Sequence, residues 1–297
     1  MNERLNALPV SNEIKSYLIG KDNVFADKHK FYINLTKFYS PAFPVSSAIE
    51  LDTLIDGSYL YFRSLLLADS IFDDPHTNKD KLLLLLPIFE EAVKKLAYIF
   101  PERHKFWIKF YQAKQEYFES ILNERRLTLD GQITSKVFVT IAIAKSSVCY
   151  SILDALNDIS DNQIDTLALK KSLEDIHIGF QYLDDIDDFK EDLERGQRTY
   201  AHSMVEGELK DKHGNVEMDN ENKHKYLFIS GIAESLILKA CNHFTQALSV
   251  ARQYNLKDLE NFLQSEITQC QSQVYEINLL IEKTKIKAKK SYTVIQK

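Results

Sequence analysis

Residues 181–192 read Gln181-Tyr-Leu-Asp-Asp-Ile-Asp-Asp-Phe-Lys-Glu-Asp192. In a helix, Asp184, Asp188 and Asp192 fall at positions i, i+4 and i+8, which places three carboxylates in one column on one face. Like charges at this spacing repel one another at a cost of roughly 0.2–0.5 kcal/mol per pair. Such a column therefore either faces water or binds cations. Oxygen ligands at this density suit a hard divalent ion such as Mg²⁺.

The segment that leads into this stretch is apolar on more than one side. Its apolar residues are Ile176, Ile178, Phe180, Tyr182 and Leu183. A helix that is apolar most of the way around is buried, and carboxylates at the end of a buried helix line a cleft in which they need partners. Taken alone, the charge run is equally well explained as a solvated helix face.

A second acidic stretch has the same layout. Residues 65–75 read Leu65-Leu-Leu-Ala-Asp69-Ser-Ile-Phe-Asp73-Asp74-Pro75, an apolar helical run that carries aspartates at i and i+4 before a proline ends it. Two such helices can face each other across one pocket. Their aspartates could then hold a cluster of Mg²⁺ ions and a diphosphate between them.

Together the two stretches resemble the aspartate motifs of the class I isoprenoid synthase superfamily, and within it the trans-prenyl diphosphate synthases. The Phe-Gln-x-x-Asp-Asp-x-x-Asp signature of that family is matched by Phe180, Gln181, Asp184, Asp185 and Asp188. The Asp-Asp-x-x-Asp signature is matched by Asp69 and Asp73, with Ser70 in place of the middle carboxylate. The second match is specific, whereas the first is degenerate.

The resemblance implies a set of site residues. It implies three bound Mg²⁺ ions held by Asp69, Asp73, Asp184 and Asp188, with Asp185 as a further catalytic residue. It also places Phe72, Phe180 and Gln181 at the cavity, where aromatic faces could stabilise a carbocation. Ordinary core packing is the alternative for each aromatic residue.

A lysine in the apolar helix after Gly131 contacts the diphosphate in the family. This sequence offers Lys136 and Lys145, which lie nine residues apart and so point to opposite sides of a helix. The position of Ile133 slightly favours Lys136, and Ser146 favours Lys145. A lysine that reaches from an apolar helix to solvent is the alternative for both.

Two arginines follow the second motif directly. Arg195 and Arg198 are candidates for binding the diphosphate, because a guanidinium is always charged. For Arg195 an alternative is that its charge complements the helix dipole.

The composition indicates an all-α fold. There are 8 Gly and 6 Pro residues, and no proline follows Pro101, as expected of long helices. We expect one domain over residues 1–297, a helical bundle around a central cavity. The expected helices cover residues 1–20, part of 21–37, 46–74, 80–100 with a kink at Pro87, 101–127, 133–156, 167–194, 223–254 and 256–287. Residues 206–222 are expected to form a charged loop.

Charge and cysteine content exclude several classes. The net charge of −6 argues against nonspecific binding of nucleic acid. Cys149, Cys241 and Cys270 fit reduced cytoplasmic thiols, not a disulfide framework. The first residues lack a signal-peptide pattern, and the apolar runs at 82–86 and 137–144 are too short to span a bilayer. A di-iron bundle needs two Glu-x-x-His pairs, but Glu174 and His177 give that spacing only once.

The sequence departs from the family at the site of the second substrate. Val24 stands where the Gly-Lys-x-x-Arg stretch has its arginine, and Asn78 and Lys79 occupy the zone of an arginine pair. We therefore expect a Mg²⁺-dependent enzyme of the terpene synthase type that ionises one allylic prenyl diphosphate. The alternatives are a chain-elongating trans-prenyltransferase and a non-catalytic partner subunit. The resemblance also allows a homodimer.

Overall fold

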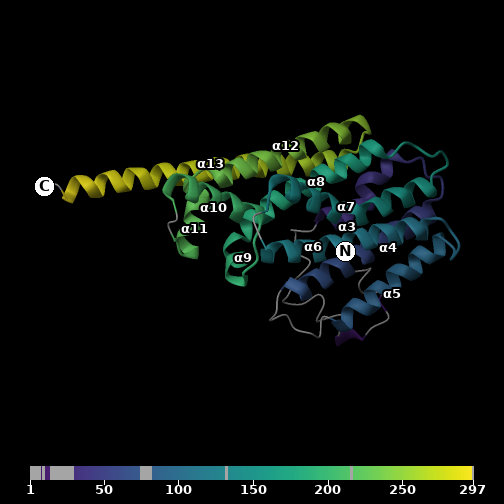
Figure 1. Cartoon of the computed structure of the whole chain (residues 1–297). Coiled ribbons are helices and arrows are strands. Elements are labelled where there is room, and N and C mark those ends of the chain that lie inside the picture. The colour runs from purple at the N-terminus through teal and green to yellow at the C-terminus, as the bar shows by residue number, and fades with distance from the viewer. Residues whose placement is uncertain are drawn as a thin grey trace. The chain divides into compact units, whose positions relative to one another are not determined.

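The structure is a computed structural model of the chain. It describes Leu8 and residues 11–13, 30–73, 82–130, 133–214 and 217–295, without the side chains of 72, 73, 128–130, 213 and 286–295. These residues form α-helices and one short 3-10 helix (Figure 1), and they contain no β-strand. The all-α class that the sequence predicts is confirmed.

The chain divides into two compact units. Unit 1 comprises Met1–Ala113, Val148–Leu169 and Tyr254–Leu256; unit 2 comprises Lys114–Ser147, Lys170–Gln253 and Lys257–Lys297. The division falls inside three helices, α6 (Phe106–Asp130), α7 (Ser135–Asp158) and α8 (Leu167–Asp187), so that each contributes residues to both units. The expectation of one domain over residues 1–297 stays a prediction.

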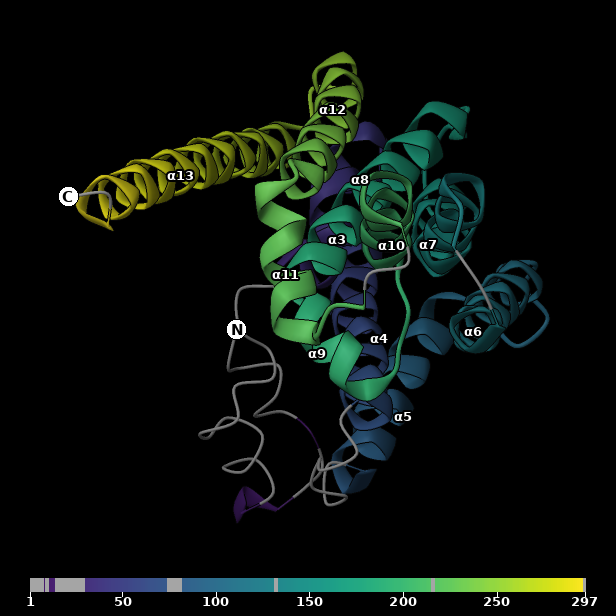
Figure 2. The same ribbon diagram turned by 60° about the vertical axis from the view of Figure 1, so that its left-hand side comes forward.

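Unit 1 contains the helix with the first aspartates. Its complete described helices are α3 (Lys30–Tyr39), η2 (Ser40–Ala42), α4 (Ala48–Asp73) and α5 (Leu82–Ile99), and Figure 2 shows α4 beside α5. Aromatic rings fill its core: the rings of Tyr61 and Phe110 lie 4.9 Å apart. Pro87 lies inside α5, as the sequence predicts.

The expectation that Pro101 opens the next helix is wrong. Residues 101–105 form turns, and α6 begins at Phe106. Two side chains explain the later start. Nδ1 of His104 accepts a hydrogen bond from the backbone N–H of Phe106 at 3.1 Å, and the indole of Trp107 donates to the carbonyl of Phe100 at 2.9 Å. The N–H of Phe106 and the carbonyl of Phe100 are thus satisfied by side chains. In a helix that began at Pro101, the N–H of Phe106 would bond to a backbone carbonyl instead.

Unit 2 contains the second aspartate motif and the C-terminal helices. After α8 come α9 (Phe189–Arg195), α10 (Tyr200–His213), α11 (Asn220–Ile229), α12 (Ile232–Gln253) and α13 (Lys257–Ile295). Helices α12 and α13 run side by side (Figure 1). At 1.5 Å per residue, α13 is about 58 Å long and α12 about 33 Å, so α13 extends beyond its neighbour.

Three expectations about helix boundaries in unit 2 are wrong. Residues 206–213 belong to α10, because Ala201, Val205 and Leu209 give that helix a buried stripe. Residues 223–254 form two helices, because Gly231 adopts a φ of 86° that breaks the chain's helical path. Residues 167–194 are also interrupted, with Asp188 between α8 and α9.

Helix α7 is long and apolar. With 24 residues and a mean hydropathy of 1.5 in its most apolar window, it could cross a membrane by length and composition alone. The sequence predicts a helix of about this length at residues 133–156, whereas the expectation that no segment spans a bilayer rests on the shorter apolar run at 137–144. However, 56% of that window is buried inside the protein, as in a core helix, so this helix is weak evidence of a membrane span.

Candidate functional site

The end of α8 presents the second aspartate motif. The column survives the break between α8 and α9, because the N–H of Asp188 donates to the carbonyl of Asp184 at 2.9 Å, and the N–H of Asp192 donates to the carbonyl of Asp188 at 2.9 Å. Asp184 and Asp188 are partly exposed, whereas Asp185 is buried. The predicted spacing therefore holds, with Asp184 and Asp188 accessible to a ligand.

Asp185 is the buried anchor of the motif. Its Oδ2 accepts a hydrogen bond from the N–H of Ala201 at 3.1 Å, and its Oδ1 accepts one from Nε2 of Gln181 at 3.3 Å. Burial raises the pKa of Asp185 to about 7; the two hydrogen bonds act in the opposite direction, and the nearby charges of Glu124 and Asp184 raise it further. Asp185 thus ties α8 to the first turn of α10.

Of the two candidate lysines, Lys145 lies beside the motif. Its Nζ is 3.5 Å from Oε1 of Gln181 and 2.5 Å from Oε2 of Glu124, which lies on α6. Lys136 is exposed on the same helix, α7. The nine residues between them place the two lysines on opposite faces, as the sequence predicts.

A small recess lies against Asp185. Its lining residues come from α6, the segment before α7, α7 itself, α8, the segment after α9 and the start of α10: Glu124, Ile133, Phe138, Ile141, Gln181, Asp185, Gln197, Arg198, Thr199 and Tyr200. Its free volume is about 20 Å³, room for one water molecule. The recess is therefore too small for a prenyl chain, but it brings Arg198 and Gln181 to the same place as Asp185.

The two candidate arginines differ in their surroundings. Arg198 lines the recess and lies 3.7 Å from Oε2 of Glu206. Arg195 pairs with Glu191 one turn earlier on α9 and does not line the recess. The alternative explanation of Arg195 as a charge near a helix end fits this placement.

Aromatic residues of the motif pack within unit 2. The ring of Phe180 lies 5.2 Å from that of Phe244 on α12 and 6.3 Å from that of Phe262 on α13. On another side of α8, the ring of Tyr182 lies 4.4 Å from that of Phe138. Phe180 therefore packs against other core residues, which is the alternative that the sequence leaves open to a role in lining the cavity.

The first motif lies at the end of α4 in unit 1. Asp69 is exposed, and the hydroxyl of Ser70 donates to the carbonyl of Leu67 at 2.9 Å. The side chains of Phe72 and Asp73, and all of Val24, Asn78 and Lys79, lie outside the described part of the chain. Asp69 and Asp184 belong to different units, so their meeting across one cavity stays a prediction.

The donor set fits a hard divalent ion. Among the described residues, no three His, Cys, Asp or Glu side chains converge on one metal position. Mg²⁺, however, keeps several waters and is commonly bound by one or two carboxylates plus substrate phosphates. Asp184 and Asp188 are partly exposed at one helix end and offer such carboxylates. The column of Asp184, Asp188 and Asp192 contains oxygen ligands only, which is the ligand type that Mg²⁺ prefers.

Several residues around the motif were not expected from the sequence. Glu124 pairs with Lys145 across helices, and Gln197, Thr199 and Tyr200 line the recess. Gln197, Thr199 and Tyr200 are neighbours of Arg198 in the sequence, and this proximity could have indicated that they belong to the site. Glu124 carries no local signal, because its role depends on how α6 packs against α7.

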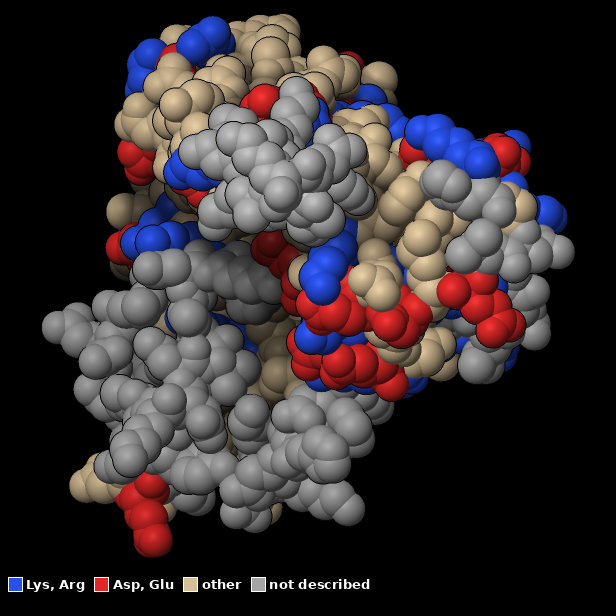
Figure 3. Space-filling view, turned by 90° about the vertical axis from the view of Figure 1, so that its left-hand side faces the viewer, with Lys and Arg blue, Asp and Glu red and all other residues tan. Residues whose placement is uncertain are grey.

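Surface charge on one face of the molecule is mixed. On the face shown in Figure 3, Asp and Glu side chains are interspersed with Lys and Arg side chains. The expectation that the protein does not bind nucleic acid nonspecifically stays a prediction that rests on the net charge of −6.

Comparisons with known proteins show which fold this is. No protein-family model matches the sequence. No curated protein matches it either. The structure is similar to a polyprenyl synthase from Caulobacter crescentus CB15 complexed with calcium and isoprenyl diphosphate, with a TM-score of 0.68 and 13% identity over 89% of this chain and 92% of that chain.

Two further solved structures are similar. A polyprenyl synthase from Roseobacter denitrificans has a TM-score of 0.67 and 14% identity, over 90% of this chain and 92% of that chain. Octaprenyl pyrophosphate synthase from Helicobacter pylori has a TM-score of 0.62 and 16% identity, over 90% of this chain and 99% of that chain. The chain therefore has the isoprenoid synthase-like fold that the motifs predict.

Proposed function

Because its fold is that of the polyprenyl synthases, we propose that the chain is a divalent-metal-dependent prenyltransferase that extends an allylic prenyl diphosphate with isopentenyl diphosphate. The observation that carries the proposal is the end of α8, where Asp184 and Asp185 lie on the helix that also places Gln181 beside Lys145, and where Asp188 follows directly after the helix. A solved neighbour of the same fold is complexed with calcium and isoprenyl diphosphate, which supports a divalent ion and this substrate class.

Each polar residue has a proposed role. Asp184 and Asp188, together with Asp69 and Asp73 of the first motif, would hold Mg²⁺, which neutralises charge on the leaving diphosphate. Lys145 and Arg198 bind diphosphate oxygens through charge-assisted hydrogen bonds. Asp185, tied to Ala201, keeps the end of α8 in place against α10.

The reaction follows from these roles. The bond between C1 and oxygen of the allylic substrate breaks, and the diphosphate leaves with the electron pair. The double bond of isopentenyl diphosphate attacks the allylic cation, and a proton is lost to give the longer allylic diphosphate. Cationic side chains aimed at the leaving group stabilise its developing charge most strongly in the transition state.

A specific feature of the sequence favours a second candidate, a one-substrate enzyme of the terpene synthase type. Val24, Asn78 and Lys79 stand where elongating enzymes of the resembled family carry arginines. In that reaction the allylic cation is quenched by proton loss or by water, and no isopentenyl diphosphate is consumed.

One assay tests the proposal and separates the two candidates. The protein is incubated with Mg²⁺ and geranyl, farnesyl or geranylgeranyl diphosphate, with and without isopentenyl diphosphate, and both diphosphate release and organic products are measured. We expect a longer prenyl diphosphate only when isopentenyl diphosphate is present. Product from the allylic substrate alone supports the one-substrate enzyme, and no diphosphate release under any condition contradicts both.

A further inference from the structure

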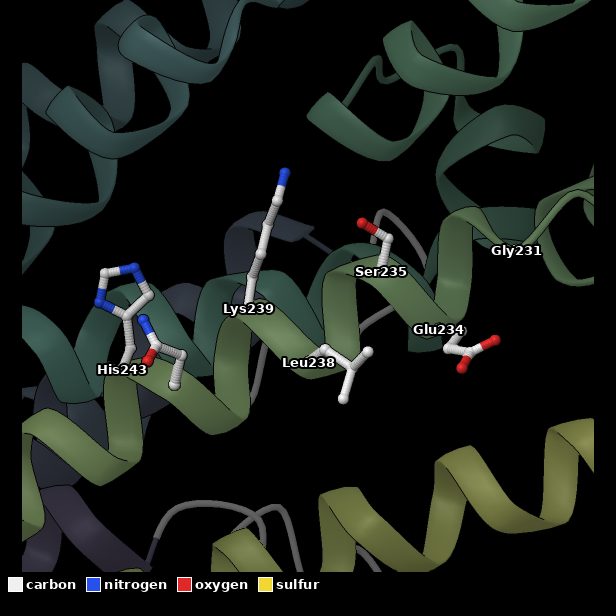
Figure 4. A pocket seen from close by; sticks show the side chains of 7 residues that line it. Gly231, Glu234, Ser235, Leu238, Lys239 and His243 are labelled. Atoms are coloured by element: carbon white, nitrogen blue, oxygen red, sulfur yellow. The ribbon is translucent and has the colours of Figure 1, made fainter.

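A second hollow of unit 2 lies along α12 and shares no lining residue with the recess at the end of α8 (Figure 4). Its volume of about 450 Å³ is in the range of small-molecule sites. Ser235, Lys239 and His243 follow one another at intervals of four residues and therefore share one face of the helix. Figure 4 shows these three side chains pointing to the same side, away from α13.

Lys239 brings a positive charge to this hollow. Its Nζ lies 5.4 Å from the ring centroid of Tyr200 and 5.7 Å from that of Tyr182, so two aromatic faces hold the ammonium. Within the described part of the chain, no carboxylate lies within 4.0 Å of this ammonium. A half-buried cation held in this way is positioned for an anion that comes from outside the described protein.

His243 is oriented by a buried carboxylate. Its Nδ1 donates to Oδ1 of Asp175 at 2.9 Å, and Asp175 is only 3% exposed. The ring of His243 also stacks on Tyr182 at a centroid distance of 6.1 Å. With Nδ1 committed to Asp175, Nε2 is the ring nitrogen left to face the hollow.

The remaining lining residues agree with an anionic ligand. Asn242 adds an amide and Ser235 a hydroxyl, and each can donate a hydrogen bond. Glu234 is the acidic residue of the lining; Figure 4 shows it pointing away from Lys239, and its Oε1 lies 3.4 Å from Nδ2 of Asn278 on α13. The charge that faces the hollow from α12 is therefore that of Lys239.

From this arrangement we infer that α12 carries a binding site for a phosphate group, with Lys239, Ser235 and Asn242 as its donors. The site is distinct from the aspartate motif, and its recognition does not depend on the proposed reaction. The ligand chemistry is that of a phosphate or diphosphate, which exists free in solution or as the headgroup of an anionic lipid. The donors here are an ammonium, a hydroxyl and an amide, so binding needs no metal ion.

Isothermal titration calorimetry with inorganic phosphate and diphosphate, in the presence of a chelator, tests the site. The wild-type protein binds one equivalent of diphosphate. Lys239→Met keeps a side chain that can pack on Tyr182 and Tyr200 but lacks the charge, and it should weaken binding about tenfold or more, because a hydrogen bond to a charged group is lost. Lys239→Arg should retain most of the affinity.

Two matched variants make the result decisive. Lys225→Met removes an exposed lysine of α11 that pairs with Glu221, and it should bind as the wild type does. Lys145→Ala removes the candidate diphosphate ligand beside Gln181, and it should also retain binding. Equal affinity of Lys239→Met and Lys225→Met overturns the inference, as does a loss confined to Lys145→Ala. Thermal melts confirm that each variant is folded, and Ser235→Ala, which removes a neutral donor of the lining, should also weaken binding.

A vesicle experiment identifies the source of the phosphate group. Sedimentation with phosphatidic acid vesicles, compared with phosphatidylcholine vesicles, should show no binding that depends on Lys239 if the ligand is a free anion. Binding to phosphatidic acid that is lost in Lys239→Met assigns the site to a lipid headgroup. Absence of both diphosphate binding and vesicle binding overturns the site.

Discussion

Oδ2 of Asp185 accepts a hydrogen bond from the backbone N–H of Ala201, 3.1 Å away. Ala201 is the second residue of α10, and the first N–H groups of a helix have no partner within the helix. A carboxylate of the second aspartate motif thus satisfies an amide that would otherwise be buried without a partner. The position of α10 depends on the same residue that the family resemblance places in the catalytic set.

This bond predicts a stability effect at Asp185. Asp185→Ala leaves the buried N–H of Ala201 unsatisfied, which should lower the free energy of unfolding by about 1–3 kcal/mol. Urea denaturation followed by circular dichroism measures the change. Asp211→Ala, at an exposed position of α10, should stay within about 0.5 kcal/mol of the wild type. Equal effects of the two substitutions would contradict the anchoring role.

Asp184 and Asp188 should matter for activity and not for folding. Asp184→Asn and Asp188→Asn remove metal-binding charge, so we expect diphosphate release to become undetectable. Because the carboxylates of the column repel one another, each variant should be as stable as the wild type or up to about 0.5 kcal/mol more stable. Diphosphate release and thermal melts in a chelator measure both effects. An active variant, or one that unfolds, would count against the metal site.

The two lysines of α7 should behave differently. Lys145→Ala removes a cation beside Gln181 and Glu124, and we expect kcat/KM to fall about 10- to 100-fold, since a charge-assisted contact is worth about 1.5–3 kcal/mol. Lys136→Ala, at an exposed position of the same helix, should change kcat/KM less than about twofold. Steady-state kinetics of the two variants side by side test the assignment, and the reverse order would transfer the role to Lys136.

His177 predicts a pH dependence of stability. Burial, and then the charge of Lys145, lower its pKa to about 3, so the ring stays neutral in the folded protein while the unfolded chain takes up a proton below about pH 6.5. This contribution to stability is full above pH 6.5 and is lost as the pH falls. Between pH 7 and pH 4.5, the wild type should lose about 2 kcal/mol more than His177→Gln in urea titrations. Parallel pH profiles of the two proteins would show that His177 titrates normally.

Gly179 and Gly207 form a matched pair of helical glycines. A Cβ at Gly179 would lie 2.6 Å from the ring of Phe244, whereas one at Gly207 would meet nothing within 4 Å. We expect Gly179→Ala to destabilise unit 2 by about 1–3 kcal/mol through overpacking. Gly207→Ala should stabilise α10 by about 0.5–1 kcal/mol. Urea denaturation midpoints measure both changes in stability. If the two substitutions change stability in the same direction, the close approach of α8 and α12 at Gly179 is contradicted.

The sequence predicts the helical class and the second motif well, because both rest on local signals. The scarcity of Gly and Pro indicates long helices, and the spacing of Asp184 and Asp188 is retained in the structure. Helix ends are predicted poorly where long-range contacts decide them. The capping bonds of His104 and the burial of Val205 depend on neighbours that the local pattern does not reveal.

The candidate site is predictable only in part for the same reason. Gln181 and Asp185 belong to a motif, but the pairing of Lys145 with Glu124 joins two helices and has no sequence signature. Likewise, the four-residue spacing of Lys239 and His243 is visible in the sequence, whereas Asp175, which orients His243, lies 68 residues away. Partners of this kind require the tertiary structure.

The segmentation of unit 1 has a consequence for synthesis. Its residues come from Met1–Ala113, Val148–Leu169 and Tyr254–Leu256, so its last segment leaves the ribosome only when most of the chain has been translated. Domains generally fold as units, and an emerging chain exposes apolar surface until its partners arrive. The surfaces of unit 1 that Val148–Leu169 and Tyr254–Leu256 cover must therefore wait for these later segments, and slowing elongation after residue 113 should increase the time during which chaperones can bind the nascent chain.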